Sequence, residues 1–394
     1  MALLIFIELY YILSPMRLLK KGLEIELYGG TKEGKVLPLS TMLCQHFKTM
    51  SQEPDKRNFE YTTKPATHYE ELFNQIILPR TRIRKYLKEL GNLTLIPGST
   101  LSLPFKKNFS PSKPLDPYHK FIGKTYKTKI ITTSLHINIG IKDYETLFRL
   151  LCALRFDTPL FLALSASSCF YDGKLSGFHS YRWHIFPKTP HFIPFFTNHN
   201  EYVRWVNQEL QTKKMFNVRH LWTSIRPNGP DRPEKLNRIE IRICDFIKDI
   251  NQSLALVAFI ETICQSYLIN DEWPKIICQK KSSLDKLVKL LENQEELAAK
   301  EGLNAKIWDW RTDSQKTIQE IITSLYKDLL STGKKLSMNS YLKPILQILE
   351  TGNETTHFLN EYKKNKSIDI TIQHFIREFN KMDLDALRQI KKGY

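Results

Sequence analysis

The stretch NRIEIRICD (residues 237–245) alternates strictly between polar and apolar side chains. Because successive side chains of a β-strand point to opposite faces, Arg238, Glu240 and Arg242 fall on one face of the predicted strand and three isoleucines fall on the other. The isoleucine face requires a core to pack against. The opposite face presents a carboxylate between two guanidinium groups, which is unusual for a simple solvated surface.

Three other segments follow the same rule, with an apolar back and a polar front. They are GLEIELY (22–28), NFEYT (58–62) and SLHINIG (134–140), whose polar fronts carry Glu24 and Glu26, Glu60, and His136 and Asn138. One interpretation is the solvated face of an antiparallel sheet, which is common for any single strand. Solvated fronts are usually filled with Thr, Lys, Ser and Gln, however, whereas these four hold short acids, one His and two Arg. The joint pattern therefore favours a functional site.

The chemistry of these side chains indicates phosphoryl transfer. Glutamates two residues apart on a strand, such as Glu24 and Glu26, have Cα atoms ~6.5–7 Å apart, and their carboxylates can converge on a divalent cation. Magnesium prefers oxygen ligands and commonly keeps phosphate oxygens in its coordination shell. Arginine presents a planar fork that matches phosphate or carboxylate. Catalysis of phosphoryl transfer is mostly charge neutralisation and positioning.

The chain of 394 residues is 42% hydrophobic and carries a formal net charge of +17, which allows one large domain or two ordinary ones with a basic surface. No recognised nucleic-acid motif occurs, so small anionic substrates are favoured over nucleic acid; a non-catalytic basic binding protein remains the alternative of a different class. The six cysteines form no C-x-x-C pair, which favours a reduced, cytoplasmic setting.

The pattern of elements predicts an α+β fold with a helical C-terminal third. Besides the four strands, we expect strands at 35–39, 93–103 and 219–226, a helix at 68–90 interrupted at Pro79, a loop at 104–128, a helix at 143–156 capped by Asp143, and helices at 199–214, 251–270, 283–300, 314–331, 339–350 and 354–390. Residues 1–15 are apolar but too short to span a bilayer, which takes ~20 residues, and are expected to be an extension. The catalytic domain is expected at 16–332 and a helical segment packed on it at 333–394, without a membrane anchor.

Three other sequence features could suggest a functional or structural role. GGTKEGKV (29–36) has the spacing of a phosphate-binding loop, but Val36 replaces the required Ser or Thr and a strand is expected to follow, so we interpret it as a hairpin turn. SASSC (165–169) lacks the G-x-S-x-G pattern of a nucleophilic serine. Asp245 is a candidate N-cap for a helix starting near residue 247.

The following segments occur in this order along the chain: GLEIELY, EYTT, LIPGSTLSL, HINIG, residues 159–187, LWTSIRP, RIEIRICD and NQEELAAKEGLNAKIWD. In sequence and order they resemble glutamate–cysteine ligase family 2, within the carboxylate–amine ligases. The resemblance covers roughly residues 16–330. It implies a glutamine synthetase-like fold, with a largely antiparallel curved sheet and flanking helices. It also implies an ATP- and Mg²⁺-dependent reaction, in which glutamate is phosphorylated on its γ-carboxylate and the amine of cysteine attacks. A different acceptor amine is the alternative, and the oligomeric state is left open.

The resemblance also implies roles for the residues of the polar fronts. The metal ligands would be Glu24, Glu26, Glu60 and Glu240. Arg242 and Arg238 would neutralise the charge of the phosphoryl group or of the substrate carboxylates, and His136 would lie at the edge of the metal or phosphate site. Arg182, Arg226 and Asn138 would contact the nucleotide or the substrate. Asn138 departs from the His-x-His pattern of much of the family. It can coordinate or donate through its amide, but it cannot titrate.

Overall fold

The computed structural model describes residues 17–270 and 281–392 of the chain, so the predicted extension at residues 1–15 lies outside the described residues. Its centre is a seven-stranded antiparallel sheet in the order β2-β3-β1-β5-β9-β8, with β4 paired to the second half of β1. The strands are β1 Lys21–Thr31, β2 Met50–Gln52, β3 Asn58–Thr62, β4 Leu93–Ile96, β5 Leu135–Gly140, β8 Ile225–Asn228 and β9 Arg238–Ile241. The four strands predicted from the alternating polar fronts are therefore all present, and in the structure they are neighbours.

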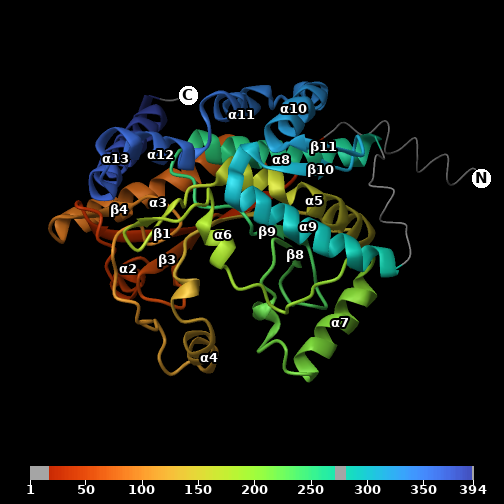
Figure 1. Ribbon diagram of the computed structural model, residues 1–394, viewed down its shortest axis with the longest axis horizontal. Helices are drawn as coiled ribbons and strands as arrows, with labels where there is room; N and C mark the ends of the chain where they lie inside the picture. Colours follow the sequence, from red (N-terminus) through yellow and green to blue (C-terminus); the bar gives the residue numbers. More distant parts are fainter. Residues whose placement is uncertain (1–16, 271–280, 393–394) are drawn as a thin grey trace, which may run out of the picture.

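Helices surround this sheet (Figure 1). They are α2 Ser40–His46, α3 Tyr69–Glu89, α4 Pro117–Tyr126, α5 Tyr144–Ser165, α6 Tyr181–Ile185, α7 His199–Gln211, α8 Ile250–Asn270, α9 Lys281–Glu301, α10 Ile318–Lys335, α11 Asn339–Thr351, α12 Glu354–Asn365 and α13 Ile368–Lys392. Figure 1 shows α8 and α10 to α13 gathered along one side of the molecule, while α4 and α7 project from the opposite side. The predicted class, helices combined with an antiparallel sheet, is confirmed.

The apolar backs of the strands form the core, as the alternation requires. Ile137, Ile239 and Ile241 are fully buried and belong to one cluster with side chains of α5 and α8. Both helices are apolar around most of their circumference, which is typical of a helix buried inside a protein. The 20-residue segment Ile250–Ile269 of α8 is long and apolar enough to cross a membrane, but 78% of its most apolar window is buried against the rest of the chain, which identifies it as a core helix.

Two local predictions are confirmed by hydrogen bonds. Asp143 caps α5, because its carboxylate accepts from the backbone N–H of Thr146 at 2.7 Å. The GGTKEGKV segment is a turn: the N–H of Thr31 donates to the carbonyl of Lys35 at 3.0 Å, and no helix begins at its end, since α2 starts only at Ser40. A Cβ on Gly30 would lie 2.1 Å from the Lys35 carbonyl oxygen, so the close approach of the two arms requires glycine there.

Several predicted boundaries are wrong, for physical reasons. Residues 35–39 contribute one bridge rather than a strand, because Val36 pairs only with Gly30 before α2 begins. The loop predicted at 104–128 contains α4, where Asp116 caps the helix and Pro117 occupies its first position. Pro79 does not interrupt α3, which continues through it.

Other elements differ in extent or kind. The strand expected at 93–103 stops at Ile96, and the one expected at 219–226 consists of the 3₁₀ turn η2 (Val218–His220) and then β8. The helix expected at 314–331 begins only at Ile318, because Ser314–Thr317 (β11) pairs with Lys306–Asp309 (β10) in a hairpin. The long helix expected at 354–390 is two helices, α12 and α13, separated at Lys366 in the left-handed conformation. A second small hairpin joins β6 (Phe170–Tyr171) to β7 (Lys174–Leu175).

The C-terminal helices pack against the body of the sheet and its helices. Asp383 of α13 lies between Arg80 and Arg84 of α3, with its Oδ2 2.5 Å from the Arg84 Nε, and all three side chains are buried. Asn353, the cap of α12, donates to the carbonyl of Ala163 in α5 at 2.8 Å. Helix α10 continues to Lys335, past the expected boundary at residue 332.

Candidate active site

The register of the sheet places the polar fronts of four strands beside one another. Residues directly opposite each other in an antiparallel pair project from the same face. Three such pairs carry the predicted site: Glu26 opposite Glu60, Glu24 opposite His136, and Asn138 opposite Glu240. The polar residues predicted from separate segments therefore form one continuous row across the sheet.

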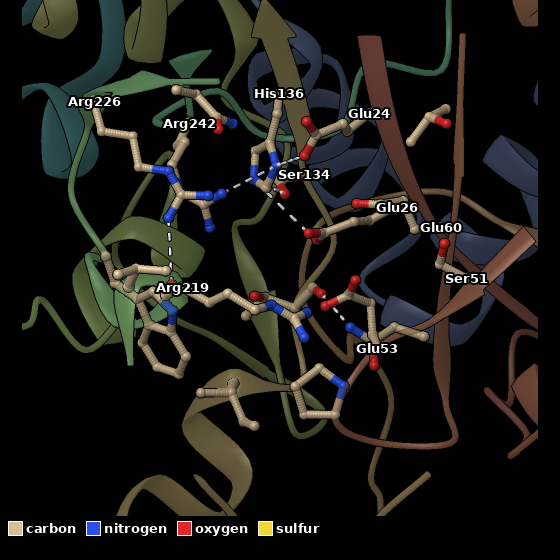
Figure 2. A pocket seen from close by; sticks show the side chains of 18 of the residues that line it. Glu24, Glu26, Ser51, Glu53, Glu60, Ser134, His136, Arg219, Arg226 and Arg242 are labelled. Carbon is tan, nitrogen blue, oxygen red and sulfur yellow. Dashed lines mark hydrogen bonds and ion pairs between the residues drawn. The ribbon is translucent and has the colours of Figure 1, made fainter. Parts of the chain in front are cut away.

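His136 lies near the middle of this row (Figure 2). Its Nδ1 is 3.2 Å from a carboxylate oxygen of Glu24, and its Nε2 is 2.9 Å from the Ser134 hydroxyl. Oxygens of Glu26 and Glu240 each lie 3.8 Å from the ring nitrogens. A single buried imidazole thus lies within 4 Å of three carboxylates from two strands, two of them on β1 and one on β9.

Two overlapping groups of side chains have the spacing of a cation site. The ligand atoms of Glu24, Glu60 and His136 all lie within 4.8 Å of one another, and so do those of Glu26, Glu53 and Glu60. Figure 2 shows the four glutamates directed toward the same space. Carboxylate oxygens with one imidazole nitrogen are suitable ligands for a hard divalent cation such as Mg²⁺. The residues present therefore fit the cofactor that the resemblance implies.

The electrostatics of three of these four acids, Glu26, Glu53 and Glu60, point the same way. Burial, and then the charges of Glu53, Glu24 and Glu26, raise the pKa of Glu60 well above its usual range. Burial is also the main cause that raises the pKa values of Glu26 and Glu53. The acids are gathered with too little positive charge to hold them all ionised, and a divalent cation would supply that charge.

Glu240, at the other end of the row, has the opposite surroundings. Arg226 donates to both of its oxygens, at 2.7 and 3.0 Å, while Asn228 donates at 2.6 Å and Arg242 at 2.5 Å. Burial opposes its ionisation, but the charges of Arg226 and Arg242 outweigh burial and hold the pKa of Glu240 well below its usual range. Glu240 is fully buried and anchors two guanidinium groups.

Asn138 connects the two ends. Its amide nitrogen donates to Glu24 at 3.1 Å, and its amide oxygen accepts from Arg238 Nε at 3.0 Å. The residue that replaces the second imidazole of the family pattern thus fixes both an acid of the cation site and a guanidinium. This bridging contact needs a donor and an acceptor on one short side chain, which the amide supplies.

Arg182 and Asp245 build the scaffold behind the site. Arg182 donates to the backbone carbonyls of Ile243 and Arg242, both at 3.0 Å. Asp245 does not cap a helix as predicted, since α8 begins at Ile250; its carboxylate accepts from the N–H of Ser167 and from the hydroxyls of Ser168 and Ser180. Ser167 and Ser168 of the SASSC segment are therefore held by a buried carboxylate, while the Ser165 hydroxyl donates to carbonyls of α5, so these serines are not arranged as nucleophiles.

A cavity of about 610 Å³ opens over the row. Of the predicted residues, its lining includes Glu24, Glu26, Glu60, His136, Arg182, Arg226, Arg238 and Arg242, while Glu240 lies behind the guanidinium groups and Asn138 faces a neighbouring cavity. Sequence analysis missed Glu53, Ser134, Arg219 and Arg232, which also line it. The register gives a signal for Glu53, because Ser51 pairs with Glu60 and Glu53 follows two residues later, with the parity of the same face.

The neighbouring cavity, of about 770 Å³, meets the first one at Glu24, Thr62 and Arg238, which line both. Its wall carries the cationic side chains of Arg17, Lys20 and Lys142 in addition to Arg238. The row of acids therefore lies between a cavity lined by both acidic and basic side chains and a second, basic cavity. Such an arrangement suits two reactants that approach a shared cation from different sides.

Solved structures with the same fold define the class of protein. The bifunctional glutathione synthetase from Pasteurella multocida superposes with a TM-score of 0.74 at 14% identity, over 98% of this chain and 55% of that longer one. Glutamate–cysteine ligase from Francisella tularensis, solved in complex with AMP, gives a TM-score of 0.66 at 13% identity over 96% of this chain and 94% of that one. The fold is that of the glutathione synthetase and glutamate–cysteine ligase structures.

Residues 20–378 match glutamate-cysteine ligase family 2 (GCS2), and the chain belongs to this family. A relative from Herpetosiphon aurantiacus, named "Putative glutamate--cysteine ligase 2", is 23% identical over 80% of this chain and 81% of its own length. One of the same name from Solibacter usitatus is 27% identical over 62% of this chain and 61% of its own length. The family predicted from the motif order is confirmed, and the protein is a ligase of the glutamate–cysteine ligase family.

Proposed function

We propose that the protein joins the γ-carboxylate of L-glutamate to the amine of L-cysteine at the expense of ATP, giving γ-glutamylcysteine, ADP and phosphate. The observation that carries the proposal is the meeting of five metal-ligating side chains and two anchored guanidinium groups over one cavity. This combination suits transfer of a phosphoryl group, in which negative charge must be neutralised and held in place.

The acid end of the row would hold Mg²⁺ through Glu24, Glu26, Glu53, Glu60 and His136. When bound, Mg²⁺ supplies positive charge to phosphate oxygens. The raised pKa values of Glu26, Glu53 and Glu60 support this assignment, because these carboxylates have no neighbouring cation among the described residues sufficient to keep them all charged.

The basic cavity supports an assignment for ATP. Arg17, Lys20, Lys142 and Arg238 would attract the triphosphate, with the terminal phosphate directed toward Glu24, where the two cavities meet. Glutamate and the acceptor amine would occupy the cavity of about 610 Å³ on the other side. The AMP complex of the Francisella tularensis protein is consistent with nucleotide use in this fold.

The reaction proceeds in two displacements. An oxygen of the glutamate γ-carboxylate attacks the terminal phosphorus of ATP and expels ADP, leaving an acyl phosphate. The amine nitrogen of the acceptor then attacks the acyl carbon, loses a proton and expels phosphate. Arg242, fixed by Glu240, and Arg238, fixed by Asn138, would offset negative charge on the transferred group because their side chains are already oriented.

The setting we propose is the reducing cytoplasm. The five cysteines within the described residues are free, and four of them are buried. Burial raises the pKa of Cys44 to about 11 and that of Cys244 to about 12, so these thiols are poorly reactive at neutral pH.

The test is ADP release by the purified protein, with the dipeptide product identified by mass. We expect turnover to need glutamate, cysteine, ATP and Mg²⁺ together, and omission of any one to abolish it. Other amino acids and amines replacing cysteine in the same assay measure acceptor preference. ADP release that is independent of glutamate would contradict the proposal; faster turnover with another amine would keep the chemistry and change the acceptor.

A further inference from the structure

Arg232 belongs to the loop between β8 and β9 and was not a predicted site residue. This loop folds back on itself, with Asp231 and Lys235 paired in an isolated bridge. Residues 229–232 line the cavity of about 610 Å³, next to Arg226 and Asn228 at the end of β8. The loop therefore forms part of the cavity wall on the arginine end of the row, away from the acids of β1 and β3.

The guanidinium of Arg232 lacks the partners that the neighbouring arginines have. Its Nη1 is buried and has no hydrogen-bond partner within the part of the chain that the structure describes, and no ion pair to a described acid occurs. By contrast, Arg226 and Arg242 share Glu240, and Arg238 is held by Asn138. A buried donor without an acceptor costs roughly 1–3 kcal/mol, and more for a charged group.

The electrostatics at Arg232 are equally unfavourable without an added anion. Burial, followed by repulsion from Arg226, lowers the pKa of Arg232 to about 10. Arg226 and Arg232 line the same cavity and repel each other; Arg226 is paired with Glu240, whereas Arg232 has a buried Nη1 without a partner among the described residues. Arg232 is therefore available to receive a negatively charged group from the cavity. An anionic ligand would accept a hydrogen bond from the Arg232 Nη1 and would also offset the repulsion between Arg232 and Arg226.

We propose that Arg232 binds a carboxylate of an amino-acid substrate and holds that substrate at the arginine end of the cavity; this inference rests on the proposed ligase function. The carboxylate is favoured over a phosphate because Arg232 does not line the basic cavity assigned to the triphosphate. Glutamate and the acceptor amino acid each carry an α-carboxylate that does not react. Placing it against Arg232 would keep it away from the repelling acids of the cation site.

The experiment measures KM for glutamate and for cysteine separately, in wild type, Arg232→Gln and Arg232→Lys. Loss of a charge-assisted contact to carboxylate is expected to raise the KM of the bound substrate about 10- to 100-fold in Arg232→Gln, with partial recovery in Arg232→Lys. A rise for glutamate assigns the contact to the donor, and a rise for cysteine assigns it to the acceptor. Lys235→Gln is the matched control, because it removes a positive charge from the same loop at an exposed position outside the cavity lining.

KM does not depend on the fraction of folded enzyme, so a partly misfolded variant still reports on binding, and high substrate should restore turnover in Arg232→Gln. Unchanged KM values for both substrates would overturn the inference, as would an equal rise in Lys235→Gln. Absence of turnover in the wild type with every amine tested would instead reject the proposed function. The two failures are therefore distinguishable.

Discussion

The two ends of the polar row contain the same residue type in opposite surroundings. Glu60, on β3, has carboxylate neighbours and a raised pKa, whereas Glu240, on β9, is saturated by Arg226, Asn228 and Arg242 and has a lowered pKa. The difference shows that Glu240 has its counter-charges within the protein, while Glu60 is surrounded mainly by other acids. Burial alone cannot explain this, since burial acts against ionisation at both glutamates; the sign of the neighbouring charges decides the outcome.

The largest expected effect is the loss of turnover when a carboxylate is removed from the acid end of the row. Glu60→Gln removes the one carboxylate common to both candidate cation groups, so we expect turnover to fall about 1,000-fold, the upper range for loss of one preorganised electrostatic contact. Its folding stability should stay equal or rise, because repulsion from Glu53, Glu24 and Glu26 is relieved. Steady-state ADP release and denaturant unfolding measure the two quantities. Glu89→Gln, at an exposed site on α3, is the control, and a Glu60→Gln enzyme with full turnover would contradict the cation assignment.

At the arginine end, removal of a carboxylate should lower the folding stability. Glu240→Gln leaves the buried guanidiniums of Arg226 and Arg242 without their counter-charge, and breaking a buried ion pair by removing one partner costs roughly 3–5 kcal/mol. We expect the free energy of unfolding to fall by about 3 kcal/mol in urea or guanidinium titrations. If Glu240→Gln and wild type had equal stability, the inferred difference between the surroundings of Glu240 and Glu60 would be contradicted.

His220 offers a pH-dependent test of the scaffold beside Arg226. It lies between Arg219 and Leu221, whose carbonyls accept from Arg226, and its ring contacts the hydroxyl of Tyr126 at 3.1 Å. Burial lowers the pKa of His220 to about 4, below the usual 6.5. As pH falls from 6.5 toward 4, only the unfolded state binds the proton, so stability should decrease by roughly 3 kcal/mol across that interval from this group. His220→Gln should show a correspondingly shallower loss in acid titrations of unfolding, and an unchanged slope would contradict the assignment.

The smallest expected effect is the pH dependence of stabilisation by Mg²⁺ at the acid end of the row. Without a divalent cation, ionisation of Glu26, Glu53 and Glu60 destabilises the folded state as pH rises through the ordinary carboxyl range toward their raised pKa values. Because Mg²⁺ binds the ionised form, its stabilising effect should grow with pH, reaching about 1–2 kcal/mol at millimolar Mg²⁺ and pH 8. Melting temperatures with and without Mg²⁺ at pH 6 and pH 8 measure it. In Glu60→Gln the Mg²⁺ effect should be nearly absent at both.

Alternation in the sequence was sufficient to predict the four central strands and which of their residues share the polar face of the sheet. A period of two assigns each side chain to a face without reference to the rest of the chain, and an isoleucine-rich back fixes which face is buried. Local hydrogen bonding was equally readable, as the Asp143 cap and the turn at 29–36 show. Where the signal was weaker, as in the hairpin of β10 and β11, the polar sequence SQKT resembled the start of a helix.

The partners of the site residues could not be read from the sequence. Glu240 and Arg242 were predicted on one face, but the capture of Glu240 by Arg226 depends on the register between β8 and β9. Arg232 lies in an irregular loop, where no period assigns a direction to a side chain, and Glu53 follows a strand of only three residues, whose pairing with β3 becomes known only from the structure. Asp245 seemed free to cap a helix until the fold brought the serines of residues 167–180 to its carboxylate.

The sequence by itself determined the family, the strands, and the set of acids and arginines that share a face, because side-chain alternation and motif order are local properties. Only the tertiary structure decided which carboxylates remain without a cation and which are already paired. That outcome depends on distances between segments far apart in the chain, and the energy of a buried charge is set by what lies within a few ångströms of it.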